Sequence, residues 1–176
     1  MIRSLFRSVR RARIHACRHH RTQQKERIMK KDYNKPENGI KIESVDPCEE
    51  TLCDWIDRSF DAFAEQNGVV CHYTPFAFAA KQNGTVIGVV KGHSFYREVH
   101  VSDLIVAQDF RGQGIGKRLM TAVEEHFHGR GFDNLNLTTY RFQAPAFYQK
   151  CGFTLEYIRE NPACPALAKY FFVKEV

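Results

Sequence analysis

A glycine-rich turn between a strand-like and a helix-like segment is the feature of this chain that most constrains its fold. Residues 111–116 read Arg-Gly-Gln-Gly-Ile-Gly, after an apolar run that ends at Val106. Such a turn leaves backbone N–H groups unpaired at the start of a helix, where the helix dipole adds positive potential. We therefore predict an α/β fold with a phosphate-binding site at this junction.

Two common phosphate-binding turns do not fit this sequence. A P-loop needs Gly-Lys followed by Ser or Thr, whose hydroxyl holds Mg²⁺, whereas Gly116-Lys117 is followed by Arg118. A dinucleotide fingerprint needs G-x-G-x-x-G, but the glycines here stand at 112, 114 and 116. Residues 111–116 instead match Arg/Gln-x-x-Gly-x-Gly/Ala. This pattern resembles the pyrophosphate-binding signature of the GNAT family of acetyl-CoA-dependent N-acetyltransferases.

The resemblance to the GNAT family extends over residues 40–176. Residues 100–106 resemble the family's fourth strand, 117–130 its pyrophosphate helix and 132–139 its fifth strand. Ala144-Pro-Ala-Phe-Tyr148-Gln-Lys-Cys-Gly-Phe153 resembles the family's Ala-x-x-x-Tyr-x-x-x-Gly-Phe segment. Within the family, residues 139–148 and 169–174 look most like the branch loosely called histone- and polyamine-type. The resemblance implies the GNAT fold, a single mixed central sheet flanked by helices in which strands 4 and 5 splay apart.

The remaining patterns agree with an α/β order. Residues 40–45 alternate as a strand, and Asp46-Pro47 opens a helix whose apolar positions recur at helical spacing up to Phe63. Asn83-Gly84 between two apolar runs predicts a β-hairpin. The other predicted elements are a strand ending at Val106, a helix over 117–130, a strand over 132–139, a short helix over 144–150 and strands over 153–158 and 169–173. The apolar stripe of the helix is Leu119, Val123 and Phe127.

The net charge of +6 is unevenly distributed. Residues 1–31 carry eight Arg, three Lys and one Glu, a net +10, which leaves 15 basic and 19 acidic side chains, a net −4, on residues 32–176. We expect 1–31 to be a basic N-terminal arm outside the fold and 32–176 to be the GNAT domain. The arm fits three interpretations: sequence before a true start at Met29, a solvated or polyanion-binding arm, or a transit peptide. The body has no basic stripe, so it is not expected to bind nucleic acid.

Membrane insertion and disulfide bonding are both disfavoured. The sequence has no run of 18 apolar residues, the length that a membrane-spanning helix needs. Its six cysteines include no C-x-x-C pair, and a chain of this size can build a core without disulfides. We therefore expect reduced thiols and a cytoplasmic location.

Acetyl-CoA is the co-substrate that the resemblance implies, and no metal is expected. Backbone N–H groups of the turn would bind the pyrophosphate, and the end of the fourth strand would pair with the pantetheine arm and polarise the thioester carbonyl. Lys117 and Arg118 either approach the phosphates or are ordinary solvated helix charges. The implied cofactor-binding residues are Leu104, Ile105, Val106, Arg111, Gly112, Gln113, Gly114, Ile115, Gly116, Lys117 and Arg118.

Tyr148 stands at the position of the family's tyrosine and is the candidate general acid. A phenol, with an ordinary pKa of about 10, suits protonation of a departing thiolate. The alternative is a packed tyrosine whose hydroxyl only bonds to CoA. Many relatives have Asn three residues before the Ala of this segment, which is Ala144 here, whereas this chain has Arg141 at that position. It is open at this point whether Arg141 replaces that contact with CoA.

The general base is less clearly marked. Many relatives have a Glu in the fourth strand, but this chain offers His100, Ser102 and Asp103 there. Strand alternation puts His100 and Ser102 on one face and Asp103 on the other. His100 is a candidate base because an imidazole ordinarily changes charge near neutral pH. Asp103 is a second candidate, and a chain of water molecules is the alternative to both.

These residues together predict an N-acetyltransferase that moves an acetyl group from acetyl-CoA to a primary amine by direct attack. The acceptor is either a small-molecule amine, such as a polyamine or an amino-sugar antibiotic, or a protein lysine. Two alternatives are an acyl-CoA-sensing module without turnover and an acyltransferase for longer acyl chains. Relatives are often homodimers, and Phe171, Phe172 and Val173 are candidates for such an interface or for the interior of the sheet.

Overall fold

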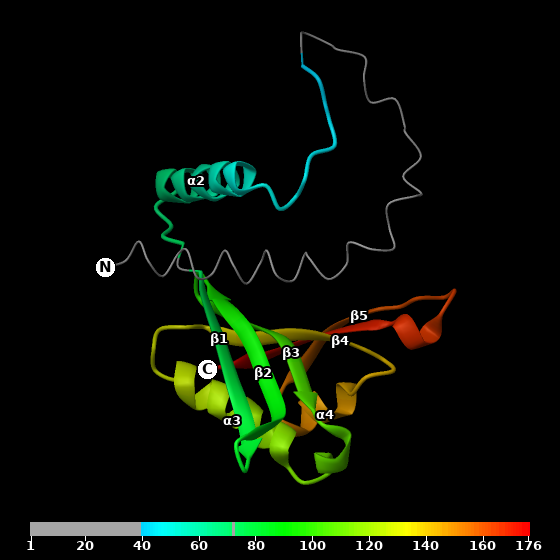
Figure 1. Ribbon diagram of the computed structural model, residues 1–176. Coiled ribbons are helices and arrows are strands. Elements are labelled where there is room, and N and C mark those ends of the chain that lie inside the picture. The colour runs from blue at the N-terminus through cyan, green and yellow to red at the C-terminus, as the bar shows by residue number, and fades with distance from the viewer. Residues whose placement is uncertain (1–39, 72) are drawn as a thin grey trace. The chain divides into compact units, whose positions relative to one another are not determined.

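The computed structural model describes residues 40–71 and 73–176 (Figure 1). The predicted basic arm, residues 1–31, lies outside these described residues. The chain divides into two units, Met1–Val70 and Cys71–Val176. Within the described part of the chain, no helix is long and apolar enough to cross a membrane.

The described part of the first unit contains one helix, α2 (Glu50–Gln66). The helix is preceded by a turn in which the Cys48 N–H donates to Asp46 Oδ1 at 3.0 Å, so it begins later than predicted. It ends at Gln66, soon after the last apolar position of the predicted helix, Phe63, and is followed by Gly68 in the left-handed region at φ +69°. The strand predicted over 40–45 is wrong: only Ile40 forms a bridge, and residues 41–46 form no strand. Alternation of apolar and polar residues does not make a strand without a hydrogen-bonded partner.

The second unit is built on a six-stranded sheet, with the order β1-β2-β3-β4-β6-β5. β3 and β4 are parallel, and the other neighbours are antiparallel. This mixed sheet confirms the predicted α/β class. The strands are β1 (Thr74–Gln82), β2 (Thr85–Phe95), β3 (Glu98–Val106), β4 (Asn134–Tyr140), β5 (Thr154–Arg159) and β6 (Lys169–Glu175). The helices are η1 (Gln108–Phe110), α3 (Ile115–Phe127), α4 (Pro145–Lys150) and η2 (Pro165–Leu167).

Local sequence signals explain most of these elements. The predicted β1–β2 hairpin turns through Asn83 and Gly84, with φ of +49° and +81°, the pattern of a two-residue turn that matches strand twist. The predicted apolar stripe of α3 is buried, as is Met120 beside it. This stripe packs on one face of the sheet, the face that also carries α4 (Figure 1). The core residues of the sheet on that face include Val90, Val99, Val101, Leu135, Leu137 and Phe172.

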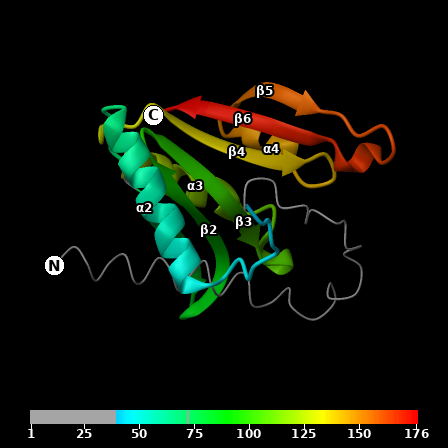
Figure 2. The same ribbon diagram turned by 90° about the horizontal axis from the view of Figure 1, so that it is seen from above.

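The pairing between β3 and β4, the expected fourth and fifth strands, covers only half of their length. Glu98 pairs with Asn134, and the register continues to Val101 with Leu137, where it stops. β3 continues to Val106 and β4 to Tyr140, so their C-terminal halves separate. Figure 2 shows β3 and β4 together at one end and apart at the other. The sheet therefore has the splayed strands that the resemblance implies.

A β-bulge lies where the two strands begin to separate. On β2, Lys91 is opposite Asp103 and Gly92 is opposite Val101, so Ser102 is the extra residue. A bulge of this kind reverses the alternation of side chains beyond it. The prediction that His100 and Asp103 lie on opposite faces is therefore wrong. Both lie on the face away from α3, opposite His93 and Lys91 respectively.

Candidate active site

The glycine turn before α3 adopts a backbone conformation that favours glycine. Gly112 and Gly114 have φ of +76° and +77°, in the left-handed region that glycine enters without strain. Nothing lies within 4 Å of the position that a Cβ would take at either residue. The first intrahelical bond runs from the Arg118 N–H to the Gly114 carbonyl at 3.0 Å. The amides before Arg118 in this turn are therefore left for another acceptor.

Side chains of the same turn tie it to the end of β3 and to η1. Arg111 Nε donates to the Val106 carbonyl at 3.0 Å, and Gln113 Nε2 donates to the Asp109 carbonyl at 3.1 Å. Arg111 thus stabilises the turn as well as adding positive charge. Lys117 and Arg118 are both exposed on the first turn of α3.

The C-terminal half of β3 presents backbone groups on the side from which β4 has separated. The Ala107 N–H donates to the Ile87 carbonyl of β2 at 2.9 Å. Because backbone groups alternate along an antiparallel strand, Ile105 also faces β2, whereas Leu104 and Val106 face away from it. Of the three residues predicted to contact the pantetheine arm, only Leu104 and Val106 therefore direct amides toward the separated side.

α4 lies against the first turn of α3 and so brings Tyr148 near the glycine turn. A Cβ added to Gly116 would be 3.2 Å from Phe147 Cζ and 3.9 Å from Val106 Cγ2. The adjacent Tyr148 is half-buried, and its ring centroid lies 5.1 Å from that of Phe147 and 6.0 Å from that of Phe172. Burial, and to a smaller extent the electrostatic interaction with Cys151, raises the pKa of Tyr148 above its ordinary value. The phenol is therefore protonated at neutral pH.

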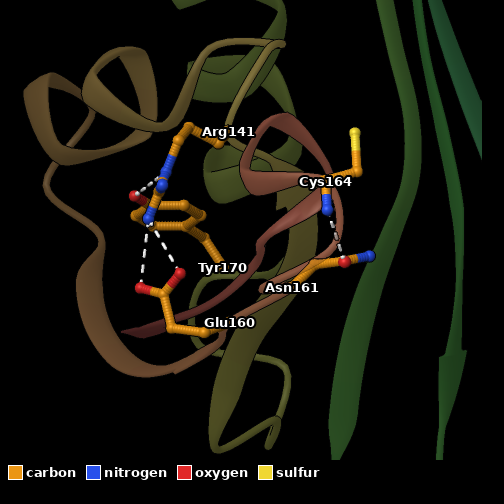
Figure 3. Close-up of polar contacts among 5 residues, drawn as sticks. All are labelled: Arg141, Glu160, Asn161, Cys164 and Tyr170. Atoms are coloured by element: carbon orange, nitrogen blue, oxygen red, sulfur yellow. Dashed lines mark hydrogen bonds and ion pairs between the residues drawn. The ribbon is translucent and has the colours of Figure 1, made fainter.

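Arg141 is held by the hairpin that joins β5 to β6 (Figure 3). Its Nη2 donates to both carboxylate oxygens of Glu160 at 3.0 Å, and its Nε donates to the Tyr170 hydroxyl at 3.2 Å. The nearby Cys164 N–H donates to Asn161 Oδ1 at 2.9 Å, which closes the turn of the same hairpin. The hydrogen bonds of Arg141 thus link the end of β4 to this hairpin.

His100 is part of a hydrogen-bonded network on the face of the sheet away from α3. Its Nδ1 lies 2.7 Å from Asn136 Oδ1, and Asn136 Nδ2 donates to Glu98 Oε2 at 3.1 Å. The His100 ring is also 5.4 Å from that of His93, centroid to centroid. Asp103, on the same face, instead forms an exposed ion pair with Lys91 at 3.2 Å.

The predicted catalytic residues thus fall into two groups. Tyr148 packs against the core between the sheet and α3, whereas His100 and Asp103 lie on the other face. The two faces meet where β3 and β4 separate, beyond Val101. Such an arrangement can hold a thioester along the open edge of β3 while an acid and a base act from opposite faces. Over residues 40–71 and 73–176, no group of three or more His, Cys, Asp or Glu side chains could hold a metal ion.

Sequence reasoning missed Asn136 and Glu160. Residues 134–137 read Asn-Leu-Asn-Leu, which places both asparagines on one face of a strand. That pattern was a usable signal for a polar cluster, but its partner His100 is 36 residues away in sequence. The sequence around Glu160 shows no comparable pattern, because the fold of the β5–β6 hairpin brings Glu160 to Arg141.

Comparison with known sequences shows to which family this chain is similar. A sequence model described as the acetyltransferase (GNAT) family matches residues 41–153. The blasticidin-S acetyltransferase of Streptomyces morookaense is 33% identical over 101 residues, which cover 56% of this chain and 73% of that protein.

Solved structures share the fold. An acetyltransferase from Bacillus cereus ATCC 14579 superposes with a TM-score of 0.63 at 20% identity, covering 76% of this chain and 98% of that one. A GNAT family acetyltransferase from Elizabethkingia anophelis, with acetyl-CoA bound, superposes with a TM-score of 0.51 at 19% identity. That alignment covers 74% of this chain and 85% of the other.

Proposed function

Because this chain belongs to the acetyltransferase (GNAT) family and is an acetyl-CoA-dependent N-acyltransferase, we propose that it acetylates a primary amine by direct attack on the thioester. The observation that carries the proposal is the meeting of three elements at one place. These are the open glycine turn, the edge of β3 from which β4 has separated, and α4 with Tyr148. The first two suit binding of acetyl-CoA, and the third suits protonation of its leaving group.

Acetyl-CoA would be held mainly by the backbone. The pyrophosphate would accept hydrogen bonds from amides between Gly112 and Lys117, where no side chain crowds the two left-handed glycines. The pantetheine amides would pair with Leu104 and Val106, whose backbone groups face away from β2. One of these N–H groups would also polarise the thioester carbonyl. The acetyl-CoA found in the E. anophelis relative supports the same co-substrate here.

Tyr148 would protonate the departing thiolate. Its neighbours Phe147 and Phe172 exclude water from the ring, and burial raises the pKa of the hydroxyl. The hydroxyl forms no hydrogen bond with any of the described residues. It is therefore a protonated donor without a competing acceptor among residues 40–71 and 73–176, as a general acid should be.

His100 and Asp103 are the candidates for the base that takes a proton from the amine. Both lie on the face opposite Tyr148, so the amine would enter from that face while the thiol leaves toward α4. Asp103 is paired with Lys91, whereas His100 is oriented by an amide. The second arrangement leaves a ring nitrogen for proton transfer.

The acceptor that we propose is a small-molecule amine. The support comes from the blasticidin-S acetyltransferase, which covers more than half of this chain at 33% identity. The histone- and polyamine-type resemblance stays a prediction, so polyamines and protein lysines belong in the same test.

The test is consumption of acetyl-CoA by the full-length protein, with release of free thiol measured across a panel of amines. The panel contains blasticidin S, amino sugars, polyamines and a lysine peptide, and a Tyr148→Phe variant serves as the matched control. We expect turnover with one class of small amine and much slower turnover in the variant. Binding of CoA without turnover on any amine would refute the proposal and favour an acyl-CoA-sensing module.

A further inference from the structure

Four polar side chains form a continuous network across β3 and β4 on the face away from α3. His100 Nδ1 lies 2.7 Å from Asn136 Oδ1, and Asn136 Nδ2 donates to Glu98 Oε2 at 3.1 Å and to Asn134 Oδ1 at 3.0 Å. Asn134 Nδ2 in turn approaches Glu98 Oε1 at 3.5 Å. The parallel register places His100 opposite Asn136 and Glu98 opposite Asn134. The network is therefore part of the pairing of the two strands.

The Glu98 carboxylate determines how the Asn136 amide is oriented. An ionised carboxylate only accepts hydrogen bonds, so Asn136 must direct its NH₂ group toward Glu98. A flipped amide would place two acceptor oxygens against each other. The remaining Asn136 oxygen then faces His100 Nδ1 at 2.7 Å. Because that oxygen cannot donate, the proton must be on Nδ1 and the lone pair of the neutral imidazole on Nε2.

We propose that Asn136 and Glu98 are positioning residues that hold His100 in its Nδ1–H tautomer and thereby make Nε2 the general base of the acetyl transfer. The inference rests on the proposed function for the reaction itself, and it adds which base acts and what orients it. His100 is the catalytic residue, and Asn136 and Glu98 act only through it.

The proton transfers balance with Tyr148 as the partner acid. The amine nitrogen forms a bond to the thioester carbonyl carbon and gives one proton to His100 Nε2. The carbon–sulfur bond breaks, and the thiolate takes the phenol proton of Tyr148. The proton on His100 then returns through water to the Tyr148 oxygen, so both side chains end as they began.

Other ionisable groups share this face of the sheet with His100. Asp103 is engaged by Lys91 at 3.2 Å, which leaves it less suited than His100 to accept a proton. The His93 ring lies 5.4 Å from that of His100, centroid to centroid. The Tyr73 ring stacks on the His93 ring at 4.9 Å. The ionisable groups to consider are His93, Glu98, Asp103, Lys91, Tyr73 and, one strand further, Glu175.

The decisive variant exchanges the amide and the carboxylate. Asn136→Asp alone would put two carboxylates where Asn136 Nδ2 and Glu98 Oε2 are now 3.1 Å apart. The double variant Asn136→Asp/Glu98→Gln restores the hydrogen bonds of residue 136 to His100 and to residue 98, and it places a carboxylate directly on His100 Nδ1–H. The Asn134 amide must then turn its NH₂ group toward residue 136, because Asn134 Oδ1 accepts from Asn136 Nδ2 at 3.0 Å in the wild type. A carboxylate there favours the imidazolium, so the acidic limb of kcat/KM should move to higher pH by about one unit. Asn136→Ala should lower kcat about tenfold, the worth of one lost hydrogen bond.

Two controls separate positioning from general damage. Glu175→Gln removes a carboxylate from the same face without altering the network, and it should leave the acidic limb in place. The ¹⁵N NMR spectrum of the neutral His100 imidazole in the full-length protein should show a protonated Nδ1 and an unprotonated Nε2. The double variant should show the same tautomer once the pH is above its shifted acidic limb, whereas Asn136→Ala should lose it.

An Nε2–H tautomer in the wild-type protein, or an acidic limb that stays unmoved in the double variant, would overturn the inference. The NMR measurement does not depend on turnover. A protein with the expected tautomer that acetylates no amine would therefore refute the proposed function, and with it the catalytic role of His100, while leaving the positioning by Asn136 in place.

Discussion

Replacement of Gly114 by alanine separates the role of the glycine turn in folding from its role in binding. Gly114 has φ of +77°, and nothing lies within 4 Å of the Cβ that alanine would add. An L-residue in the left-handed region costs about 1–2 kcal/mol, which a domain with about 5–15 kcal/mol of stability tolerates. The variant should therefore fold, with a slightly lower urea midpoint.

The same methyl group should weaken CoA binding strongly. It occupies the open space in front of the turn, where the pyrophosphate would approach the backbone amides. Each hydrogen bond to a charged group that is lost costs about 1.5–3 kcal/mol, or roughly a 10- to 150-fold loss in affinity. Isothermal titration calorimetry with CoA measures this directly.

Gly129→Ala is the matched control for this experiment. Gly129 has φ of +70° and equally open surroundings, but it follows the C-terminal end of α3. It should lose about the same stability, again about 1–2 kcal/mol, and bind CoA as the wild type does. Wild-type affinity in Gly114→Ala, or an equal loss of affinity in both variants, would refute the assignment of the pyrophosphate site.

Three further outcomes follow from the structure. Tyr148→Phe should lower kcat by about 100-fold or more with little change in the affinity for CoA, and an unchanged kcat would make Tyr148 a packing residue. Burial raises the pKa of Tyr148, and the protonated phenol is the active form, so wild-type turnover should fall only above about pH 10. A pH–rate profile in which Tyr148→Phe retains the same alkaline limb would contradict this origin. Lys174→Met removes a half-buried ion pair with Glu124 at 2.9 Å and should lower the free energy of unfolding by about 1–3 kcal/mol. Lys91→Met, which breaks only the exposed pair with Asp103, should cost less than about 1 kcal/mol, and equal urea midpoints would show that burial adds nothing.

Elements that depend only on residues close together in the sequence could be predicted from it. The Asn83-Gly84 hairpin, the apolar stripe of α3 and the glycine turn at 112–116 all formed where predicted. The failures concern pairing. Residues 40–45 alternate as a strand, but only Ile40 forms a bridge and residues 41–46 form no strand. Asp103 lies on the same face as His100 because of the bulge at Ser102.

The sequence by itself determined the strand–turn–helix segment with its glycine turn and, through the motifs at 111–116 and 144–153, the family, because each motif lies within a short window of residues. The α/β class with a mixed sheet followed from the resemblance to that family. Only the tertiary structure decided that β3 and β4 part after Val101 and that Asn136 faces His100. The physical reason is that strand register depends on contacts between residues 36 positions apart, and no local propensity specifies them. The orientation of the candidate base therefore could not be predicted from the sequence, although the sequence contains each residue that orients it.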